Sequence, residues 1–151
     1  MEIKIDSLSI IFSDAVLDIM DRHSQRKSNA PEQGGILLGR VYKDQFVVEK
    51  ISTPTELDRC SRYGFERHRL SAQFVIDYEF FNSNGQVMYL GEWHTHPEDK
   101  PTPSTVDLKM IKSQLTKNKI DAPCLLLVIK GRKSTLVGVQ TSKDFKSVMF
   151  N

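Results

Sequence analysis

The sequence predicts an α/β fold of the α+β type, in which a mixed sheet is flanked by helices. Segments that alternate apolar and polar residues, as strands do, are interspersed with segments whose apolar residues recur at helical spacing. The predicted order is strand, helix, two strands, helix, strand, helix, two strands. A length of 151 residues, with 39% hydrophobic and 26% charged residues, suits one globular domain. We therefore expect a single domain spanning residues 1–151.

Three helices are predicted, each opened by a serine whose hydroxyl can accept a hydrogen bond from the first turn. These serines are Ser13, Ser71 and Ser104. The expected helices cover residues 13–26, 72–82 and 105–117. In the second helix, the apolar residues expected to face the core are Phe74, Val75, Tyr78 and Phe81.

Six strands are predicted from short apolar or alternating runs that are bounded by turn-forming residues. They cover residues 7–12, 33–41, 45–53, 87–96, 123–130 and 134–140. Residues 54–70 show no clear periodicity, and we expect them to form a long surface loop, a kind of segment that often carries function.

The run His94-x-His96-Pro97 lies at the end of the fourth predicted strand. Residues i and i+2 of a strand project from the same face, so both imidazoles can reach one metal ion. Pro97 is expected to end the strand, and Asp107 falls in the first turn of the helix that Ser104 caps. Two histidines and a carboxylate, completed by water, are typical of a catalytic zinc site. The pattern therefore predicts a Zn²⁺ site.

Simple alternation defines the two faces of this strand. One face would carry Leu90, Glu92, His94 and His96, and the other would carry Tyr89, Gly91, Trp93 and Thr95. Because Glu92 would share the face of the histidines, it is a candidate for a general base or for a residue that orients a histidine.

The metal-binding pattern resembles the signature of the JAMM (MPN+/JAB) metalloproteases, which are zinc-dependent isopeptidases of the deubiquitinase type. In that signature the histidine pair and proline are followed, after six residues, by a Ser-x-x-Asp element, here Ser104 to Asp107. The family's second motif, Glu-x-x-Gly-x-Leu-x-Gly, is matched at every fixed position between Glu32 and Gly39. The resemblance extends from about residue 10 to 145. It implies one JAB/MPN domain with a mainly antiparallel, cytidine-deaminase-like sheet.

The resemblance also implies a role for each motif residue. His94, His96 and Asp107 would be the zinc ligands. Glu32 would act as general base and then general acid, so the resemblance favours Glu32 over Glu92 for this role. Ser104 would stabilise the oxyanion.

The segment from Tyr89 to Pro97 is similar to small bacterial JAB proteins encoded with E1/E2-like conjugation enzymes, including the deconjugase of CBASS anti-phage operons. This implies hydrolysis of the amide bond after the C-terminus of a ubiquitin-like modifier, or of a protein such as a CD-NTase that an E1/E2-like system has conjugated. The tail of such a substrate could add as a strand to a sheet edge near residues 54–70. We expect the protein to act as a monomer or weak dimer.

Composition excludes several other classes. A net charge of +2 gives no reason to expect nucleic-acid or membrane binding. No apolar run is long enough to span a membrane, no signal peptide is evident, and Cys60 and Cys124 fit neither a disulfide framework nor a zinc ribbon. These features point to the cytoplasm. The basic side chains that cluster in the expected loop, and that could hold an acidic partner, are Arg59, Arg62, Arg67, His68 and Arg69.

Three alternative functions stay open. The chain could be a zinc peptidase that processes a sulfur-carrier-like protein or a small peptide. It could be a non-catalytic scaffold of the MPN type, although all five motif residues are present. A nucleic-acid enzyme is the third alternative, which the weak basic character disfavours.

Overall fold

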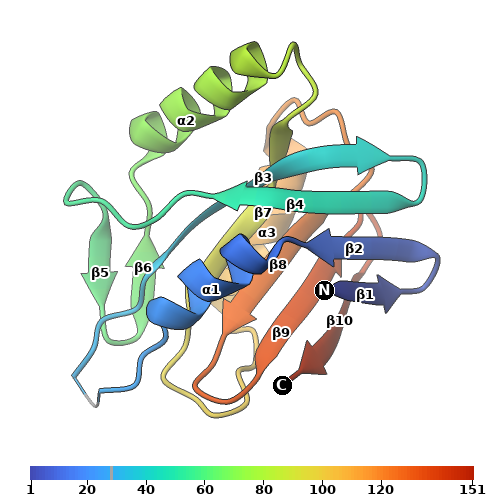
Figure 1. The fold of residues 1–151 in the computed structure, drawn as a ribbon. Coiled ribbons are helices and arrows are strands. Elements are labelled where there is room, and N and C mark those ends of the chain that lie inside the picture. Colours follow the sequence, from blue (N-terminus) through green and yellow to red (C-terminus); the bar gives the residue numbers. More distant parts are fainter. Residues whose placement is uncertain (28) are drawn as a thin grey trace.

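A computed structural model describes residues 1–27 and 29–151 (Figure 1). The helices are α1 (Asp14–Arg22), α2 (Arg69–Asn82) and α3 (Thr105–Lys117). The strands are β1 (Glu2–Ile5), β2 (Leu8–Phe12), β3 (Gly34–Tyr42), β4 (Gln45–Ile51), β5 (Arg59–Ser61), β6 (Gly64–Glu66), β7 (Met88–Thr95), β8 (Leu125–Lys130), β9 (Thr135–Gln140) and β10 (Phe145–Phe150). The predicted mixed sheet flanked by helices is confirmed.

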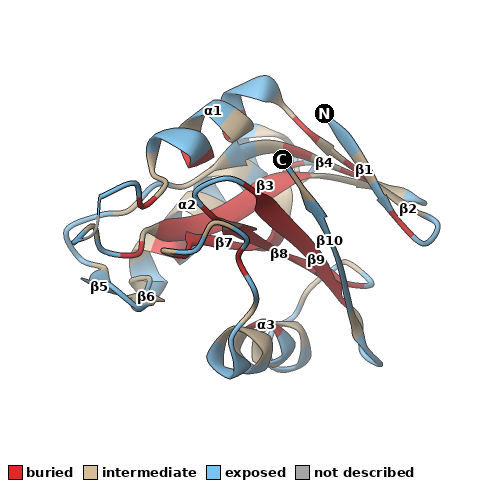
Figure 2. Cartoon of the chain, turned by 90° about the horizontal axis from the view of Figure 1, so that it is seen from below, coloured by how far each residue is buried: buried red, intermediate tan, exposed pale blue. Residues whose placement is uncertain are grey.

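Eight strands form the main sheet, in the order β1-β2-β4-β3-β7-β8-β9-β10, and β5 and β6 form a separate hairpin. The neighbours β2–β4 and β7–β8 run parallel, whereas the other neighbouring pairs are antiparallel. Helix α1 covers one face of the sheet, and α2 and α3 pack on the opposite face (Figures 1 and 2). The central strands β3, β7, β8 and β9 are buried along most of their length (Figure 2).

Helix α1 seals the larger core. The hydroxyl of Ser13 accepts a hydrogen bond from the Val16 amide, as expected of an N-cap. Val16 and Met20, one helical turn apart, are buried against side chains from the sheet that include Trp93. The helix ends at Arg22, four residues before the predicted end.

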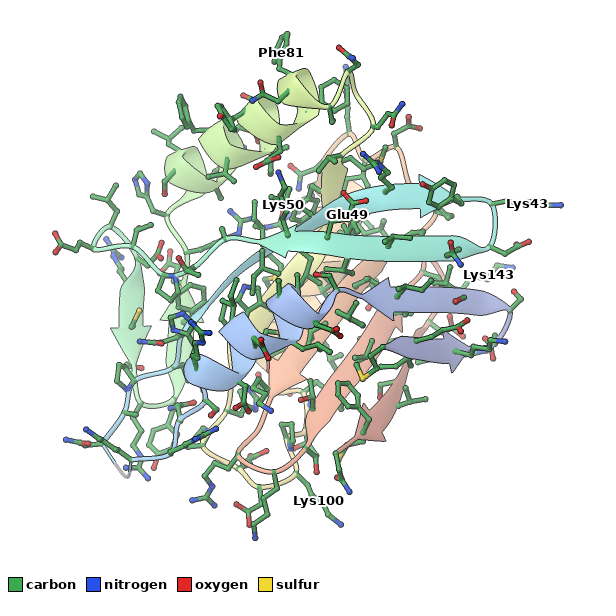
Figure 3. All side chains as sticks on the ribbon, viewed as in Figure 1. Lys43, Glu49, Lys50, Phe81, Lys100 and Lys143 are labelled. Carbon is green, nitrogen blue, oxygen red and sulfur yellow. The ribbon has the colours of Figure 1, made fainter. Side chains whose placement is uncertain are left out.

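Of the four side chains of α2 that were predicted to face the core, only Val75 does so. Ala72, with Val75 beside it, packs against Ile36 and Leu38 of β3. Phe74, Tyr78 and Phe81 are instead 60–81% exposed, and Figure 3 shows Phe81 pointing away from the molecule. A helix on the outside of a sheet buries only a narrow stripe, so a helix that is apolar around most of its circumference leaves several large residues in water. On α3, Ile111 is buried against the sheet and Leu115 packs beside it.

The alternation predicted for β7 is broken by a β-bulge. The pairing of β3 with β7 jumps from Leu37↔Gly91 to Leu38↔Tyr89, which leaves Leu90 as the extra residue. Leu90 therefore lies in the core under α1 with Trp93, whereas Tyr89 lies on the face of α2 and α3. Both were assigned to the wrong face. Gly91 makes the bulge possible, because its φ of +146° is one that other residues rarely adopt.

Several short strands were not predicted. The segment 54–70 contains the three-residue strands of the β5–β6 hairpin and the first two residues of α2, so it is only partly a loop. The N-cap of α2 is His68, not the predicted Ser71. Strands β1 and β10 at the edges of the sheet were also missed. The three- and four-residue strands β5, β6 and β1 carry too few alternations to distinguish a strand from a loop. None of the helices in the described part of the chain is long and apolar enough to cross a membrane.

Candidate metal centre

The C-terminal end of β7 brings the histidines to the centre of the sheet. His94 pairs with Gly34 of β3 on one side and with Ile129 of β8 on the other. The amide of His96, just beyond the strand, donates a 3.0 Å hydrogen bond to the Lys130 carbonyl. A Cβ atom at Gly34 would lie 2.8 Å from the His94 side chain, so glycine is needed where β3 passes the histidine. Both histidines are nine-tenths or more buried.

The start of α3 delivers the carboxylate. Ser104 is the N-cap, and its hydroxyl accepts a 3.1 Å hydrogen bond from the Asp107 amide. In return the Asp107 side chain accepts a 2.7 Å hydrogen bond from the Ser104 amide, which completes a capping box. One carboxylate oxygen, Oδ2, thus serves the helix end and also faces His96 at 3.4 Å.

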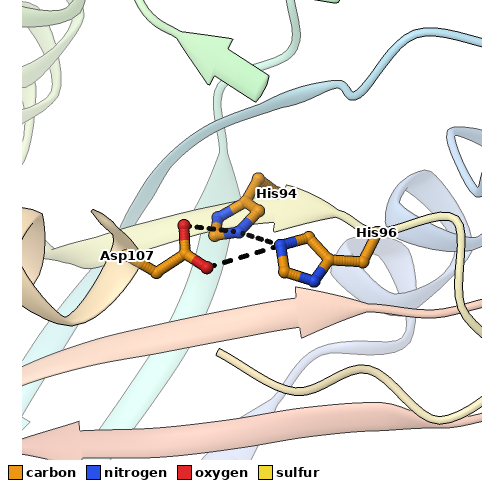
Figure 4. A group of neighbouring side chains, drawn as sticks. All are labelled: His94, His96 and Asp107. Carbon is orange, nitrogen blue, oxygen red and sulfur yellow. Dashed lines mark hydrogen bonds and ion pairs between the residues drawn. The ribbon is translucent and has the colours of Figure 1, made fainter. Parts of the chain in front are cut away.

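The three side chains converge on one point, as Figure 4 shows for His94, His96 and Asp107. The two Nε2 atoms are 3.0 Å apart, and the Nε2 atom of His94 lies 3.2 Å from Oδ1 of Asp107. One donor atom from each of the three residues can be chosen so that all three lie within 4.8 Å of one another. Tetrahedral Zn²⁺ with bonds of about 2.0–2.1 Å needs donor atoms roughly 3.3 Å apart. The chemistry and the spacing of these donor atoms are therefore compatible with a zinc site.

The charge of the cluster favours a cation. Burial by itself would raise the pKa of Asp107, but its hydrogen bonds with the two histidines outweigh burial and hold this pKa well below its usual value. Burial likewise opposes protonation of His96, yet the neighbouring Asp107 and Glu32 carboxylates raise the pKa of its imidazole. The pocket is thus electronegative enough to retain an extra positive charge.

Glu32 lies at the edge of this cluster. It is 6% exposed, and its Oε1 atom is 4.0 Å from Nε2 of His96. The backbone holds it there, because its amide donates to the Ser61 carbonyl and the next residue, Gln33, exchanges hydrogen bonds with Thr95 beside the histidines. Burial raises the pKa of Glu32 to about 7. A carboxyl with this pKa can accept and return a proton near neutral pH.

Glu92, the other candidate base, has different partners. Its carboxylate accepts two 2.9 Å hydrogen bonds from Nε of Arg67 and one of 2.6 Å from the Tyr89 hydroxyl. The carboxylate opposite the second ring nitrogen of His96 belongs instead to Glu98, at 3.9 Å from Nδ1. The Arg67 contact was missed because 25 residues separate it from Glu92 and no motif links the two.

A second residue that sequence analysis missed is Gln25. Its side chain, 2% exposed, bonds to the Ala30 and Arg62 carbonyls and accepts a hydrogen bond from the Thr95 hydroxyl. It thereby joins the segment before Glu32, the β5–β6 turn and the end of β7. A lone glutamine beyond a helix end gives no signal of such a role.

The candidate metal centre opens into a groove of about 1230 Å³. The β5–β6 hairpin, α2 and α3 form its walls, and β7 contributes to its floor. The site residues that line it are Glu32, His94, His96, Ser104 and Asp107, and Arg67, Tyr89 and Glu92 line it as well.

Fold and site together define a JAB-type domain with a His-His-Asp cluster. A family model described as prokaryotic homologs of the JAB domain matches residues 13–145, and the chain belongs to this family.

Three curated relatives carry the name CD-NTase/cGAS isopeptidase. The chain is 35% identical over 143 residues to the one from Escherichia coli (strain TW11681), covering 95% of this chain and 88% of the relative. It is 35% identical over 126 residues to the one from Pseudomonas aeruginosa (strain BWHPSA011 / Pa011), covering 83% and 79%. The relative from Vibrio cholerae serotype O1 (strain ATCC 39315 / El Tor Inaba N16961) is 34% identical over 133 residues, covering 88% and 82%.

Among solved structures, the chain resembles the solution structure of protein DSY2949 from Desulfitobacterium hafniense. The TM-score is 0.64 at 18% identity, over 92% of this chain and 89% of that chain. This likeness concerns the fold alone.

Proposed function

We propose that this chain is a zinc-dependent isopeptidase that hydrolyses the amide bond after the C-terminus of a conjugated protein, a CD-NTase being the favoured substrate. The observation that carries the proposal is the convergence of His94, His96 and Asp107 beside Glu32, at the base of an open groove. The three curated relatives, named for isopeptidase action on CD-NTase/cGAS proteins, support the substrate class. The proposal includes a single domain over residues 1–151 and a cytoplasmic place of action, where an E1/E2-like system would make the conjugate.

His94, His96 and Asp107 would hold the metal through the three donor atoms described above. Bound zinc would activate a water molecule and polarise the scissile carbonyl. The three side chains leave room for water because they supply fewer than the four protein ligands of a closed structural site.

Glu32 would move the proton. As a carboxylate it accepts a proton from the attacking water, and it then returns the proton to the departing amine nitrogen. Its burial supports this double role, because a carboxyl with a pKa of about 7 changes protonation state at little free-energy cost at neutral pH.

Ser104 would donate a hydrogen bond to the tetrahedral oxyanion. Its Oγ atom accepts from the Asp107 amide, so its own hydroxyl hydrogen stays available to donate. Its place at the start of α3 supports this role, because a helix N-terminus favours negative charge.

The groove would hold the C-terminal tail of the substrate in an extended conformation. The β5–β6 hairpin is a short two-stranded sheet on the groove wall, and a tail could pair with its edge through backbone hydrogen bonds. Such pairing would select an extended, narrow tail more than a particular sequence.

The test uses a conjugate probe and the Glu32→Gln variant. The probe joins the C-terminal peptide of a CD-NTase to a lysine side chain through an isopeptide bond, between a fluorophore and a quencher. We expect wild-type protein to bind one zinc ion and cleave the probe, chelation to abolish cleavage, and added zinc to restore it. Glu32→Gln should bind zinc normally and lose about 10²- to 10⁴-fold in kcat.

Two results would contradict this proposal. Cleavage that survives exhaustive chelation would show that the reaction does not need zinc. A Glu92→Gln variant less active than Glu32→Gln would assign the role of general base to Glu92. A linear fusion of the same peptide to a carrier protein, tested in parallel, separates isopeptidase action from processing of a linear chain.

A further inference from the structure

A buried ion pair ties the groove walls to the strand that carries the histidines. Arg67 lies between β6 and α2, one residue after the hairpin ends and two before the helix begins. Its guanidinium contacts both carboxylate oxygens of Glu92, and its Nη2 atom is 2.8 Å from Oε1. The side chains of Arg67 and Glu92 are only 18% and 6% exposed.

Glu92 is itself firmly placed. It lies on β7, two residues before His94, and pairs with Ile36 of β3 and Leu127 of β8. Tyr89 also donates to it, from the other side of the bulge at Leu90. The bulge is what puts Tyr89 and Glu92 on the same face, so that both can reach the groove.

In the described part of the chain, the hairpin has few other attachments to the body of the protein. Each of its strands has three residues, mostly exposed, and a two-stranded hairpin is marginally stable on its own. Its further ties to the body are the Ser61 and Arg62 carbonyls, which accept from Glu32 and Gln25, and the close approach of Phe65 to Gly34. These all lie at its β5–β6 turn end or on one strand. Arg67 is the tie at the opposite end, where the chain enters α2.

We propose that Arg67, held by Glu92 and Tyr89, is a positioning residue that sets the distance between the β5–β6 hairpin with α2 and the strand of the metal ligands. It thereby determines how tightly an extended substrate tail is gripped. The inference rests on the proposed function for the identity of the tail. It assigns Glu92 a role in substrate affinity, distinct from proton transfer.

The bidentate geometry explains why arginine stands at this position. A planar guanidinium that meets a carboxylate through two nitrogens resists rotation, whereas a lysine ammonium makes a single point contact. Arg67→Lys should therefore keep the charge and part of the function, and Arg67→Gln should keep neither.

The experiment compares Arg67→Gln and Arg67→Lys with Arg59→Gln. Arg59 is a matched control on the same hairpin, 86% exposed and only 4.0 Å from Glu66. A long isopeptide probe of about ten residues, which covers roughly 30 Å when extended, is cleaved beside a short probe that keeps about two residues. Hydrogen exchange of the β5–β6 amides is followed on the zinc-loaded proteins without substrate.

We expect Arg67→Gln to raise KM for the long probe about tenfold, with kcat within about twofold of wild type. Kinetics on the short probe, zinc content and Trp93 fluorescence should not change. Amides of β5 and β6 should exchange faster in Arg67→Gln, less so in Arg67→Lys, and at the wild-type rate in Arg59→Gln.

Unchanged KM for the long probe, an equal loss of kcat on both probes, or an equal effect of Arg59→Gln would overturn the inference. If wild-type protein cleaves neither probe, the proposed function fails, and hydrogen exchange still tests the positioning role. If the β5 and β6 amides of Arg67→Gln then exchange at the wild-type rate, this result alone refutes the positioning role. Should Arg67→Gln unfold, the same comparisons decide the matter in Arg67→Lys.

Discussion

Glu32 and Asp107 are carboxylates that approach the same histidine, yet their pKa values move in opposite directions. Asp107 accepts hydrogen bonds from two imidazoles and from the Ser104 amide, and these contacts stabilise its charged form. Glu32 lies 4.0 Å from His96, too far for such a bond, so burial dominates and raises its pKa to about 7. The environment would thus separate the proposed metal ligand, which must stay ionised, from the proposed proton carrier.

This difference has a consequence for stability in the metal-free protein. The pKa of Glu32 rises from about 4.5 in the unfolded chain to about 7 in the fold, so its ionisation opposes folding above pH 4.5, and the full penalty is reached above pH 7. We expect chelator-treated Glu32→Gln to be more stable than wild type by roughly 1–3 kcal/mol at pH 8. The advantage should vanish as the pH falls to 4.5. Urea unfolding across this pH range measures it, and an advantage that grows toward acid pH would contradict the burial argument.

Strand β7 and helix α2 are the elements in which simple periodicity failed. In β7, one bulge residue reverses the alternation between Tyr89 and the rest of the strand. In α2, apolar residues surround most of the helix, so the pattern does not identify the buried stripe. Both errors arise because the side a residue faces depends on its neighbours in space.

The bulge gives a sharp test at Gly91. A Cβ atom there would lie 1.9 Å from the Leu126 carbonyl oxygen, and the φ of +146° would be strained for alanine. We expect Gly91→Ala to destabilise the protein by about 2 kcal/mol or more and to weaken zinc binding, because β7 must shift. Gly64→Ala is the control, since the nearest atom to a Cβ at Gly64 would be the Ser61 hydroxyl oxygen at 3.3 Å. Its free energy of unfolding in urea should lie within about 0.5 kcal/mol of the wild-type value.

The exposed face of α2 gives the opposite test. Phe81 is 81% exposed and Phe12 is 1% exposed. Phe81→Ala should change the free energy of unfolding by less than about 0.5 kcal/mol, whereas Phe12→Ala should cost about 3–5 kcal/mol. Equal losses in chemical denaturation would show that α2 is packed as the sequence pattern suggested.

The main sheet has a core on each face, and the proposed metal ligands lie at the end of β7 and the start of α3. Trp93, the one tryptophan of the chain, is fully buried in the core under α1 and immediately precedes His94 on β7. Its fluorescence should therefore report on the site and the core together.

We expect thermal unfolding to be a single transition, with the same midpoint by Trp93 fluorescence and by far-ultraviolet circular dichroism. Added zinc should raise this midpoint, because a ligand that binds only the folded state stabilises it. The chelated protein should stay folded at room temperature, since none of the core clusters in the described residues contains a proposed metal ligand. Two separate transitions would argue against one domain.

The sequence alone determined those parts of the site that are local in the chain. The two histidines are two residues apart at the end of β7, and the capped start of α3 follows within a dozen residues, so their convergence depends on short-range geometry. Glu32 could be included only through a family motif, because 62 residues separate its segment from the histidines. Segment order, the three helices and six of the ten strands were likewise legible from periodicity and turn residues.

Only the tertiary structure decided which face of β7 carries Tyr89, which side of α2 is buried, and that Arg67 reaches Glu92. Each of these depends on contacts between segments far apart in the chain, whose free energies exceed the local preferences that a sequence pattern records. Register across a sheet and pairing across a groove are set by packing partners. Periodicity along one strand or helix cannot encode them.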